Sequence, residues 1–268
     1  MQRAKSEYAI LTVTNALRVL EAFGADEMLG VTELAKRLHL HKNNVFRILA
    51  TLEEKGWVEQ CADTERYRLG TACIRLGHAF GRARSLTRHG RVVLDAVCRE
   101  TNETAHLAVL RGMNVVMLDG VQAAGPLVTG LHLGGRLSPH CTAVGKVLLG
   151  CGAPETLERY DREVASADKL PKHTERTIVD RDKLIEHLQQ VRVQGYALDL
   201  EECAPGVVCA AAPVFDATSL LVASLAISAP ASRVDREQLE CQLAPRIAAA
   251  AAQLSRRLGA PITRDSRL

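Results

Sequence analysis

The sequence predicts an α+β protein of two domains joined by a short basic connector. Up to residue 70, apolar residues recur at helical spacing and are followed by a pattern typical of a β-hairpin. From about residue 91, short apolar strand patterns alternate with helical ones, which favours a domain with a mostly antiparallel sheet. The expected segments are a tail at 1–9, a first domain at 10–70, a linker helix at 71–90, a second domain at 91–262 and a tail at 263–268.

The composition is that of an ordinary globular chain, with 47% hydrophobic and 24% charged residues. No apolar run reaches the ~18 residues of a membrane helix, and the first residues, MQRAKSEYAI, lack the apolar core of a secretion signal. Eight cysteines without such a signal predict free thiols in a reducing compartment. We therefore expect a cytoplasmic protein with no membrane partner. Aromatic residues, at 3%, are too few for an RNA-stacking platform.

Three helices are expected in the first domain. The first, over residues 13–23, has Thr12 or Thr14 as its N-cap. Thr32 is the expected N-cap of the second helix. A short link then leads to the third helix, over about 42–54.

The third helix has one apolar face and one polar face. The apolar stripe is formed by Val45, Ile48, Leu49 and Leu52. Asn43, Asn44 and Arg47 lie on the other face. An asparagine amide matches the adenine edge, and a guanidinium matches guanine or a phosphate. This face predicts a recognition helix for double-stranded DNA.

The hairpin pattern, WVEQC, ADTE and RYRLG, completes the element order of a winged helix-turn-helix. Arg66 and Arg68 alternate with Tyr67 and Leu69, which predicts a basic wing that reaches the DNA backbone. A small helical protein-interaction domain is the alternative. The predicted DNA contacts are Thr32, Lys42, Asn43, Asn44, Arg47, Arg66 and Arg68.

The connector holds most of the local charge excess, because residues 71–91 contain no acidic residue. Its arginines are Arg75, Arg82, Arg84, Arg88 and Arg91. A basic, partly apolar helix at this place can dock on a second copy of the chain and pass near phosphates, and a plain linker is the alternative.

The second domain is expected to contain strands and helices in mixed order. The expected strands cover 103–110, 113–121, 126–133, 195–200, 207–215 and 220–228. The expected helices cover 91–100, a segment from about 141, a short helix within 154–177, a segment near 180–194 and an alanine-rich helix that ends near Leu258.

Catalytic and metal-binding motifs are mostly absent from the sequence. Gly145-Lys146 resembles part of a P-loop but lacks its first glycine and its Ser/Thr. No CxxC pair occurs, so we expect no metal, no cofactor and no enzyme activity. Two alternatives stay open. One is a thiol- or metal-responsive regulator that uses Cys203 and Cys209, and the other is an enzyme with Cys209 as nucleophile.

The second domain offers a plausible pocket for a small molecule. The strand period places Val207, Cys209 and Ala211 on one face of their strand. Ala226 and Ser228 share a face in the same way. The helix after Pro139 begins among the small residues Thr142 and Ala143, where unpaired N–H groups can hold a carboxylate. Packing of these residues in a core is the alternative.

Several long stretches resemble the IclR (isocitrate lyase regulator) family of bacterial transcriptional regulators. They are VTELAKRLHLHKNNVFRILATLEEKGWVE, HCTAVGKVLL, GYALDLEECAPGVVCAAAPVFD and LAISAP. The resemblance implies a winged helix, a linker helix and a C-terminal GAF-like effector-binding domain. It also implies a homodimer or a dimer of dimers that binds a palindromic operator, more often as a repressor than as an activator.

The resemblance also implies the place of the effector pocket. Its residues map to Leu137, Thr142, Ala143, Asp199, Val207, Cys209, Ala226 and Ser228. The family often has serine where this chain has Ala226, glycine where it has Ala143, and Ser-Thr where it has Asn43-Asn44. The implied effector is a small organic or aromatic acid. We expect a mono-acid, because the carboxylate of Asp199 would repel a second anionic group.

Overall fold

The computed structural model describes residues 10–24, 26–82, 85–125, 127–164 and 170–261, without the side chains of 77–82 and 85. The chain divides between Ala83 and Arg84 into two compact units. The two predicted tails, and the side chains of Arg82 and Arg84, lie outside the described residues.

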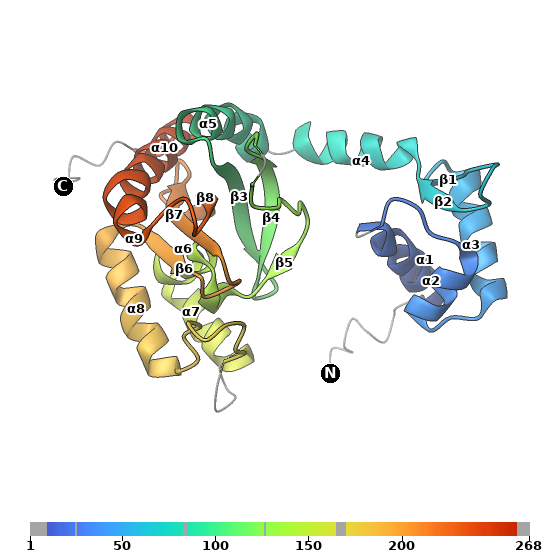
Figure 1. Ribbon diagram of the computed structural model, residues 1–268, viewed down its shortest axis with the longest axis horizontal. Helices are drawn as coiled ribbons and strands as arrows, with labels where there is room; N and C mark the ends of the chain where they lie inside the picture. The colour runs from blue at the N-terminus through green and yellow to red at the C-terminus, as the bar shows by residue number, and fades with distance from the viewer. Residues whose placement is uncertain (1–9, 25, 83–84, 126, 165–169, 262–268) are drawn as a thin grey trace. The chain divides into compact units, whose positions relative to one another are not determined.

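The N-terminal unit contains three helices, a two-stranded hairpin and a fourth helix (Figure 1). The elements are α1 (Leu11–Glu21), α2 (Val31–Leu38), α3 (Lys42–Glu54), β1 (Val58–Gln60), β2 (Tyr67–Leu69) and α4 (Thr71–Arg82). The expected apolar stripe of α3 is buried, and it packs with Val19, Leu34, Val58 and Tyr67. The order of a winged helix-turn-helix is therefore present.

The first two helices begin differently from the prediction. The N-cap of α1 is Ile10 rather than Thr12 or Thr14, and the Thr14 hydroxyl donates to the Ile10 carbonyl instead (3.3 Å). The N-cap of α2 is Gly30, so Thr32 lies within its first turn. The Glu33 carboxylate accepts the N–H of Gly30 (2.8 Å), and this contact fixes Gly30, two residues before Thr32, as the N-cap.

The C-terminal unit is a six-stranded sheet with helices on both faces (Figure 1). The strands are β3 (Thr104–Arg111), β4 (Asn114–Val121), β5 (Arg136–Leu137), β6 (Ala197–Leu200), β7 (Val207–Phe215) and β8 (Leu221–Pro230). Their order is β5-β4-β3-β8-β7-β6, and every neighbouring pair is antiparallel. The helices are α5 (Ser85–Thr101), α6 (Ala143–Gly150), α7 (Pro154–Glu163), α8 (Arg181–Gln194), α9 (Arg236–Gln238) and α10 (Ala244–Arg257).

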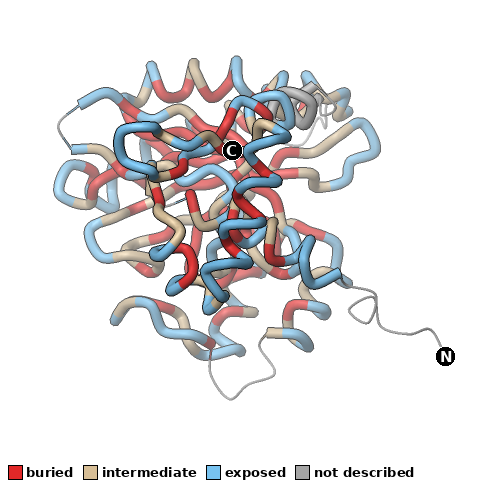
Figure 2. The backbone as a smooth tube through the Cα atoms, turned by 90° about the vertical axis from the view of Figure 1, so that its right-hand side faces the viewer, coloured by how far each residue is buried: buried red, intermediate tan, exposed pale blue. Residues whose placement is uncertain are grey.

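Two apolar layers hold this unit together, and Figure 2 shows buried segments running through its interior with exposed segments around them. One layer joins α5 and α10 to one face of the sheet. The other joins α6 and Val191 of α8 to the opposite face, through Ala108, Ala197, Ala211 and Ala226. These alanines are fully buried, and their small side chains let α6 lie close to the sheet.

Helix α5 starts earlier than the expected helix at 91–100, so the predicted border at residue 90 falls within it. Arg91 lies within this helix and contacts the sheet. Its guanidinium pairs with Asp119 of β4 (2.6 Å) and donates to the Gly120 carbonyl (2.9 Å). The last arginine of the basic stretch therefore anchors α5 to the sheet.

The predicted strand at 126–133 is wrong for its described residues, 127–133, which form a loop. Thr104 donates from its hydroxyl to the carbonyl of Thr129 (3.1 Å), and Thr129 donates from its hydroxyl to the carbonyl of Ser228 (2.9 Å). These side-chain bonds hold the loop outside the regular strand pairing. The short strand β5 pairs with β4 instead, with Leu137 opposite Val115.

A buried ion pair fastens α6 to the turn after β6. The Lys146 side chain is fully buried, and it pairs with the carboxylate of Glu202. Its ammonium group also donates to the carbonyl of Leu198 (2.9 Å). A buried charge that loses its partner keeps the cost of leaving water, so each partner depends on the other.

We expect Glu202→Gln to destabilise the protein by about 3–5 kcal/mol, because it leaves the Lys146 ammonium group without a counter-ion. The matched control is Glu201→Gln, since Glu201 pairs with the exposed Arg176 (3.0 Å). That change should cost less than about 1 kcal/mol. Denaturant unfolding of the three proteins measures both values, and equal costs for the two variants would contradict the role of the buried pair.

Candidate functional site

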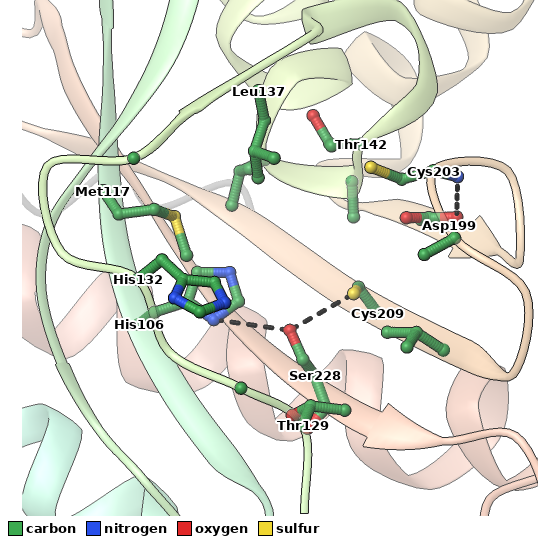
Figure 3. Close-up of a pocket in the computed structure, with 16 residues that line it drawn as sticks. His106, Met117, Thr129, His132, Leu137, Thr142, Asp199, Cys203, Cys209 and Ser228 are labelled. Carbon is green, nitrogen blue, oxygen red and sulfur yellow. Dashed lines mark hydrogen bonds between the residues drawn. The ribbon is translucent and has the colours of Figure 1, made fainter. Parts of the chain in front are cut away.

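A cavity of about 210 Å³ lies on the α6 face of the sheet, between the start of α6 and the loop after β4 (Figure 3). Seven predicted pocket residues line it: Leu137, Thr142, Ala143, Asp199, Val207, Cys209 and Ser228. Ala226 does not. Its side chain is fully buried in the apolar layer beneath α6, so its predicted place in the pocket is corrected.

Three of the lining residues form one row across the sheet. Asp199 on β6 is paired with Cys209 on β7, and Cys209 is paired with Ser228 on β8. All three side chains point to the same face, because directly paired residues of antiparallel strands share a face. The sheet therefore presents a carboxyl, a thiol and a hydroxyl side by side to the cavity.

The sequence reasoning missed several residues that line the same cavity. They are His106, Met117, Thr129, Gly130, His132, Gly135, Val144, Cys203 and Ala204. His106 lies on β3 opposite Ala226, which is two residues from Ser228 along β8. The alternation along β3 could have placed its side chain on the face of Ala108, but only the pairing of β3 with β8 brings it to the pocket.

Cys209, Ser228 and His106 form a chain of hydrogen bonds, drawn as dashed lines in Figure 3. The thiol of Cys209 donates to the Ser228 hydroxyl oxygen (3.3 Å), which lies 3.5 Å from Nδ1 of His106. Burial raises the pKa of the Cys209 thiol, which is therefore protonated at neutral pH. Burial also lowers the pKa of His106 to about 4, so its ring is neutral.

Asp199 lies at the other end of the row and is 2% exposed. Its Oδ1 accepts the backbone N–H groups of Glu202 (2.8 Å) and Cys203 (3.4 Å). Burial raises the pKa of Asp199 to about 7, and the ammonium group of Lys146, which pairs with Glu202, offsets only part of this effect. Near neutral pH this carboxyl can therefore donate as well as accept a hydrogen bond.

The start of α6 forms the wall that faces this row. Thr142 is the N-cap, and its hydroxyl oxygen accepts the N–H of Gly145 (3.2 Å) while it donates to the Ser138 carbonyl (3.0 Å). Ala143 and Val144, the first two residues of the helix, line the cavity. The positive end of the helix dipole and the first-turn N–H groups favour an anion here.

The structure brings together a different pair of cysteines from the one named in the hypothesis of a thiol-responsive regulator. Cys203 lies against Cys141, and this contact lowers the pKa of Cys203 and raises the pKa of Cys141. Cys209 donates to Ser228 instead, and all eight cysteines are free thiols. The pair Cys203 and Cys209 that the sequence suggested is therefore not the pair in contact.

Three potential metal ligands come together beside the cavity among the described residues. Ligand atoms of His140, Cys141 and His173 lie within 4.8 Å of one another. Both ring nitrogens of His140 already have partners, the Tyr160 hydroxyl (3.2 Å) and the Pro171 carbonyl (2.9 Å). A metal ion would have to displace one of these bonds.

The predicted DNA-contact residues of α3 are accessible on one side of the N-terminal unit. Lys42, Asn43, Asn44 and Arg47 are exposed, and so is Thr32 on α2. Within the described ranges, no carboxylate pairs with Lys42 or Arg47. The polar face of α3 is thus free to meet a phosphate or a base edge.

Both arginines of the predicted basic wing are paired with carboxylates, while their contact with DNA stays a prediction. Arg66 pairs with Glu33 of α2 (2.6 Å), and Arg68 pairs with Glu59 of β1 (3.1 Å). Glu59 is the direct cross-strand partner of Arg68, a relation that the hairpin register fixes. Each arginine would have to leave a carboxylate to bind a phosphate.

We expect the stability of Asp199→Asn relative to the wild type to depend on pH. The folded-state pKa of about 7 lies above the ordinary value of 3.8, so between these values the folded protein holds a proton that the unfolded chain has released. The wild type therefore loses stability as the pH rises through this range, and the uncharged asparagine does not. The variant should gain up to about 4 kcal/mol over the wild type by about pH 7, with no further gain above it.

Unfolding measured over this pH range tests the prediction, with Asp216→Asn as the control. Hydrogen bonds from Thr218 lower the pKa of Asp216 below its ordinary value of 3.8, so Asp216 is ionised in the folded and in the unfolded chain over this range. The difference between Asp216→Asn and the wild type should therefore not change with pH here. If the free energies of unfolding of Asp199→Asn and the wild type differ by the same amount at every pH, the pKa of Asp199 is not raised in the folded protein.

No helix within the described ranges is long and apolar enough to cross a membrane. Two family models match the chain, and together they cover both units. "IclR helix-turn-helix domain" matches residues 12–61, and "Bacterial transcriptional regulator IclR C-terminal" matches residues 81–256.

Known proteins resemble the chain over most of its length. The HTH-type transcriptional regulator BhcR of Paracoccus denitrificans is 33% identical over 236 residues, 88% of this chain and 83% of that protein. An IclR transcriptional regulator from Alicyclobacillus acidocaldarius has a solved structure that is 28% identical, with a TM-score of 0.80, and the alignment covers 94% of this chain and 100% of that one. An IclR homolog from Microbacterium hydrocarbonoxydans, solved in complex with 4-hydroxybenzoate, has the same fold at 22% identity, with a TM-score of 0.76 over 92% of this chain and 98% of that one.

These matches agree with the winged helix and with the α+β domain. Its relatives are transcriptional regulators rather than enzymes. The chain belongs to the IclR family of bacterial transcriptional regulators.

Proposed function

We propose that the chain is a cytoplasmic, acid-responsive repressor that binds a palindromic DNA operator as a homodimer or a dimer of dimers. The observation that carries this proposal is the cavity itself. A helix start that favours an anion faces a row of three polar side chains, Asp199, Cys209 and Ser228, inside a largely apolar wall. Such a site suits a small molecule with one acidic group.

The acid is proposed to lie with its carboxylate at the start of α6. There the first-turn N–H groups and the helix dipole offset the cost of burying a negative charge. Asp199 then meets a hydroxyl or keto oxygen of the ligand, as donor or acceptor, because its pKa is close to 7. The 4-hydroxybenzoate complex of the Microbacterium homolog supports a small aromatic acid as one member of this class.

The operator is proposed to receive α3 in its major groove. Asn43 and Asn44 stand at the start of this helix, and Arg47 follows one turn later on the same exposed side. A palindromic site needs two such helices related by a two-fold axis. Ile74 and Leu76 of α4, 61% and 60% exposed, are apolar residues that a second copy would cover.

The response to the acid is proposed to be a shift between two arrangements of the dimer. A ligand moves such an equilibrium only by its difference in affinity for the two arrangements. The acid is proposed to supply this difference through its contacts with the start of α6 and with the row on the sheet. The acid would favour the arrangement that releases the operator.

We expect Arg47→Ala to weaken operator binding by about 1–3 kcal/mol without loss of fold, because Arg47 is exposed and its side chain is not part of the apolar core. Asn43→Ala should relax the base preference more than it weakens binding to unrelated DNA. Fluorescence anisotropy with DNA selected from a random library by the wild type measures both.

The control for these variants is Arg111→Ala, an exposed arginine at the end of β3 in the other unit. It should bind the selected DNA as the wild type does. If Arg47→Ala and Asn43→Ala also bind like the wild type, α3 is not the recognition helix.

A thermal-shift screen of organic and aromatic acids should yield a stabilising acid, since a micromolar ligand at millimolar concentration adds ~4 kcal/mol to the stability. Ser228→Ala should then lose about 0.5–1.5 kcal/mol of binding free energy. Cys209→Ser should change the affinity for the acid and leave operator binding without the acid intact. Calorimetry with the acid found in the screen measures these changes.

Ser224→Ala is the matched control, because Ser224 lies on the same strand and donates to the Ala212 carbonyl (3.3 Å), outside the cavity. It should bind the acid as the wild type does. Unchanged affinity in Ser228→Ala and in Cys209→Ser would place the acid in another part of the molecule.

A further inference from the structure

We infer that His106 is a specificity-determining residue of the pocket, whose Nε2–H group donates a hydrogen bond to an oxygen at the end of the ligand that lies away from α6. This inference rests on the proposed acid-binding function and deepens it. It assigns the ligand to the acids that carry a hydroxyl or keto oxygen remote from the carboxylate.

The position of His106 in the sheet leaves one of its ring nitrogens for a ligand. The residue is 4% exposed and lines the cavity. Nδ1 lies 3.5 Å from the hydroxyl oxygen of Ser228, while Nε2 has no hydrogen-bond partner among the described residues. Nε2 is not fully enclosed by protein atoms. The small exposed part of this ring therefore includes Nε2, and it faces the cavity.

The neighbours of His106 in the sheet cannot supply the missing partner. Gly120 of β4 and Ala226 of β8 lie directly opposite it on the two sides. Neither side chain carries a polar atom. Nε2 of His106 therefore meets only the cavity, where a ligand oxygen can accept its hydrogen bond.

The hydrogen-bond chain indicates which nitrogen of His106 is the donor. The thiol of Cys209 donates its one proton to the Ser228 oxygen (3.3 Å). The Ser228 hydroxyl proton then needs an acceptor, and among the described residues Nδ1 of His106 is the one within reach (3.5 Å). We therefore assign Nδ1 as the acceptor and place the proton of the neutral ring on Nε2, since an Nδ1–H ring would leave the Ser228 proton without a partner. Burial, which lowers the pKa of this ring to about 4, keeps it neutral.

The place of His106 defines what it recognises. In Figure 3, His106 and Ser228 lie on the side of the cavity away from Thr142, the N-cap of α6. A carboxylate at the helix start therefore leaves the other end of the ligand to this imidazole. Because Nε2–H is a donor, it favours an acceptor oxygen and disfavours an ammonium group, which has only donors.

The first test needs no ligand. ¹⁵N NMR of the histidine rings should show His106 as the neutral Nε2–H tautomer at neutral pH, and Ser228→Ala should lower the population of that tautomer. The matched control is Ser224→Ala, which should leave it unchanged. An Nδ1–H ring in the wild type would overturn the inference, whatever the ligand proves to be.

The second test compares acids that differ only in the remote oxygen: 4-hydroxybenzoate with benzoate, and 3-hydroxypropanoate with propanoate. In the wild type, the hydroxylated member of the pair that fits should bind about tenfold more tightly. His106→Leu should abolish this ratio and leave the affinity for the unsubstituted acid nearly unchanged. His106→Gln, which keeps an N–H donor, should retain part of the ratio. His173→Leu, which removes an exposed imidazole outside the cavity, should retain all of it.

The outcomes distinguish a wrong role for His106 from a wrong assignment of the pocket to acids. If benzoate or propanoate binds and the ratio persists in His106→Leu, the inference is wrong while the acid-binding pocket stands. If none of the four acids binds the wild type, the proposed acid-binding function fails and the inference falls with it. Should His106→Leu not fold, the ratio in His106→Gln and the tautomer in the wild type decide the matter.

Discussion

The C-terminal domain depends on the burial of Lys146 beneath the sheet edge. This lysine is fully inside the protein, where its ammonium group meets the carboxylate of Glu202 and the carbonyl of Leu198. An ammonium group in such a place tolerates little displacement, because its cost of leaving water is offset only by these partners. Helix α6 is thereby fixed against β6 and the turn that follows it. Gly145 adds a second restraint, since a Cβ there would lie 2.2 Å from the Pro139 carbonyl oxygen.

This restraint explains why a pocket exists where it does. The start of α6 is held over the sheet, and buried alanines on β3, β6, β7 and β8 let the helix lie close to it. The polar row of Asp199, Cys209 and Ser228 lies past the N-terminal end of α6. No helix of the described residues packs over it, so a cavity remains. Lys146 pairs with Glu202, and its positive charge offsets only part of the effect of burial on Asp199. Burial then sets the titration of Asp199 near neutral pH.

Much of this arrangement could be predicted from local sequence. The stripe of α3 and the strands around Cys209 and Ser228 follow from helical and strand periods, which act over a few residues. The family resemblance brought Asp199 and Leu137 into the same site. Features that depend on distant pairing could not be predicted. His106 lies 122 residues from Ser228 in the sequence and joins the pocket only because β3 pairs with β8.

Other features that the sequence analysis did not predict also depend on contacts between distant residues. Arg66 and Arg68 look basic in isolation, and only tertiary and cross-strand contacts bring Glu33 and Glu59 to them. Similarly, the loop after β4 has the composition of a strand, and two threonine side chains hold it away from the sheet. Ala226 was expected in the pocket because it shares a strand face with Ser228, but α6 covers that rung of the sheet.

The proposed function requires that an acid in the cavity changes the affinity of α3 for DNA. The decisive measurement is the operator Kd with and without the acid, together with the acid Kd with and without the operator. Both affinities should fall by the same factor, of about 5–150, because coupling between two binding sites is reciprocal. An acid that binds the cavity and leaves the operator Kd unchanged would contradict it.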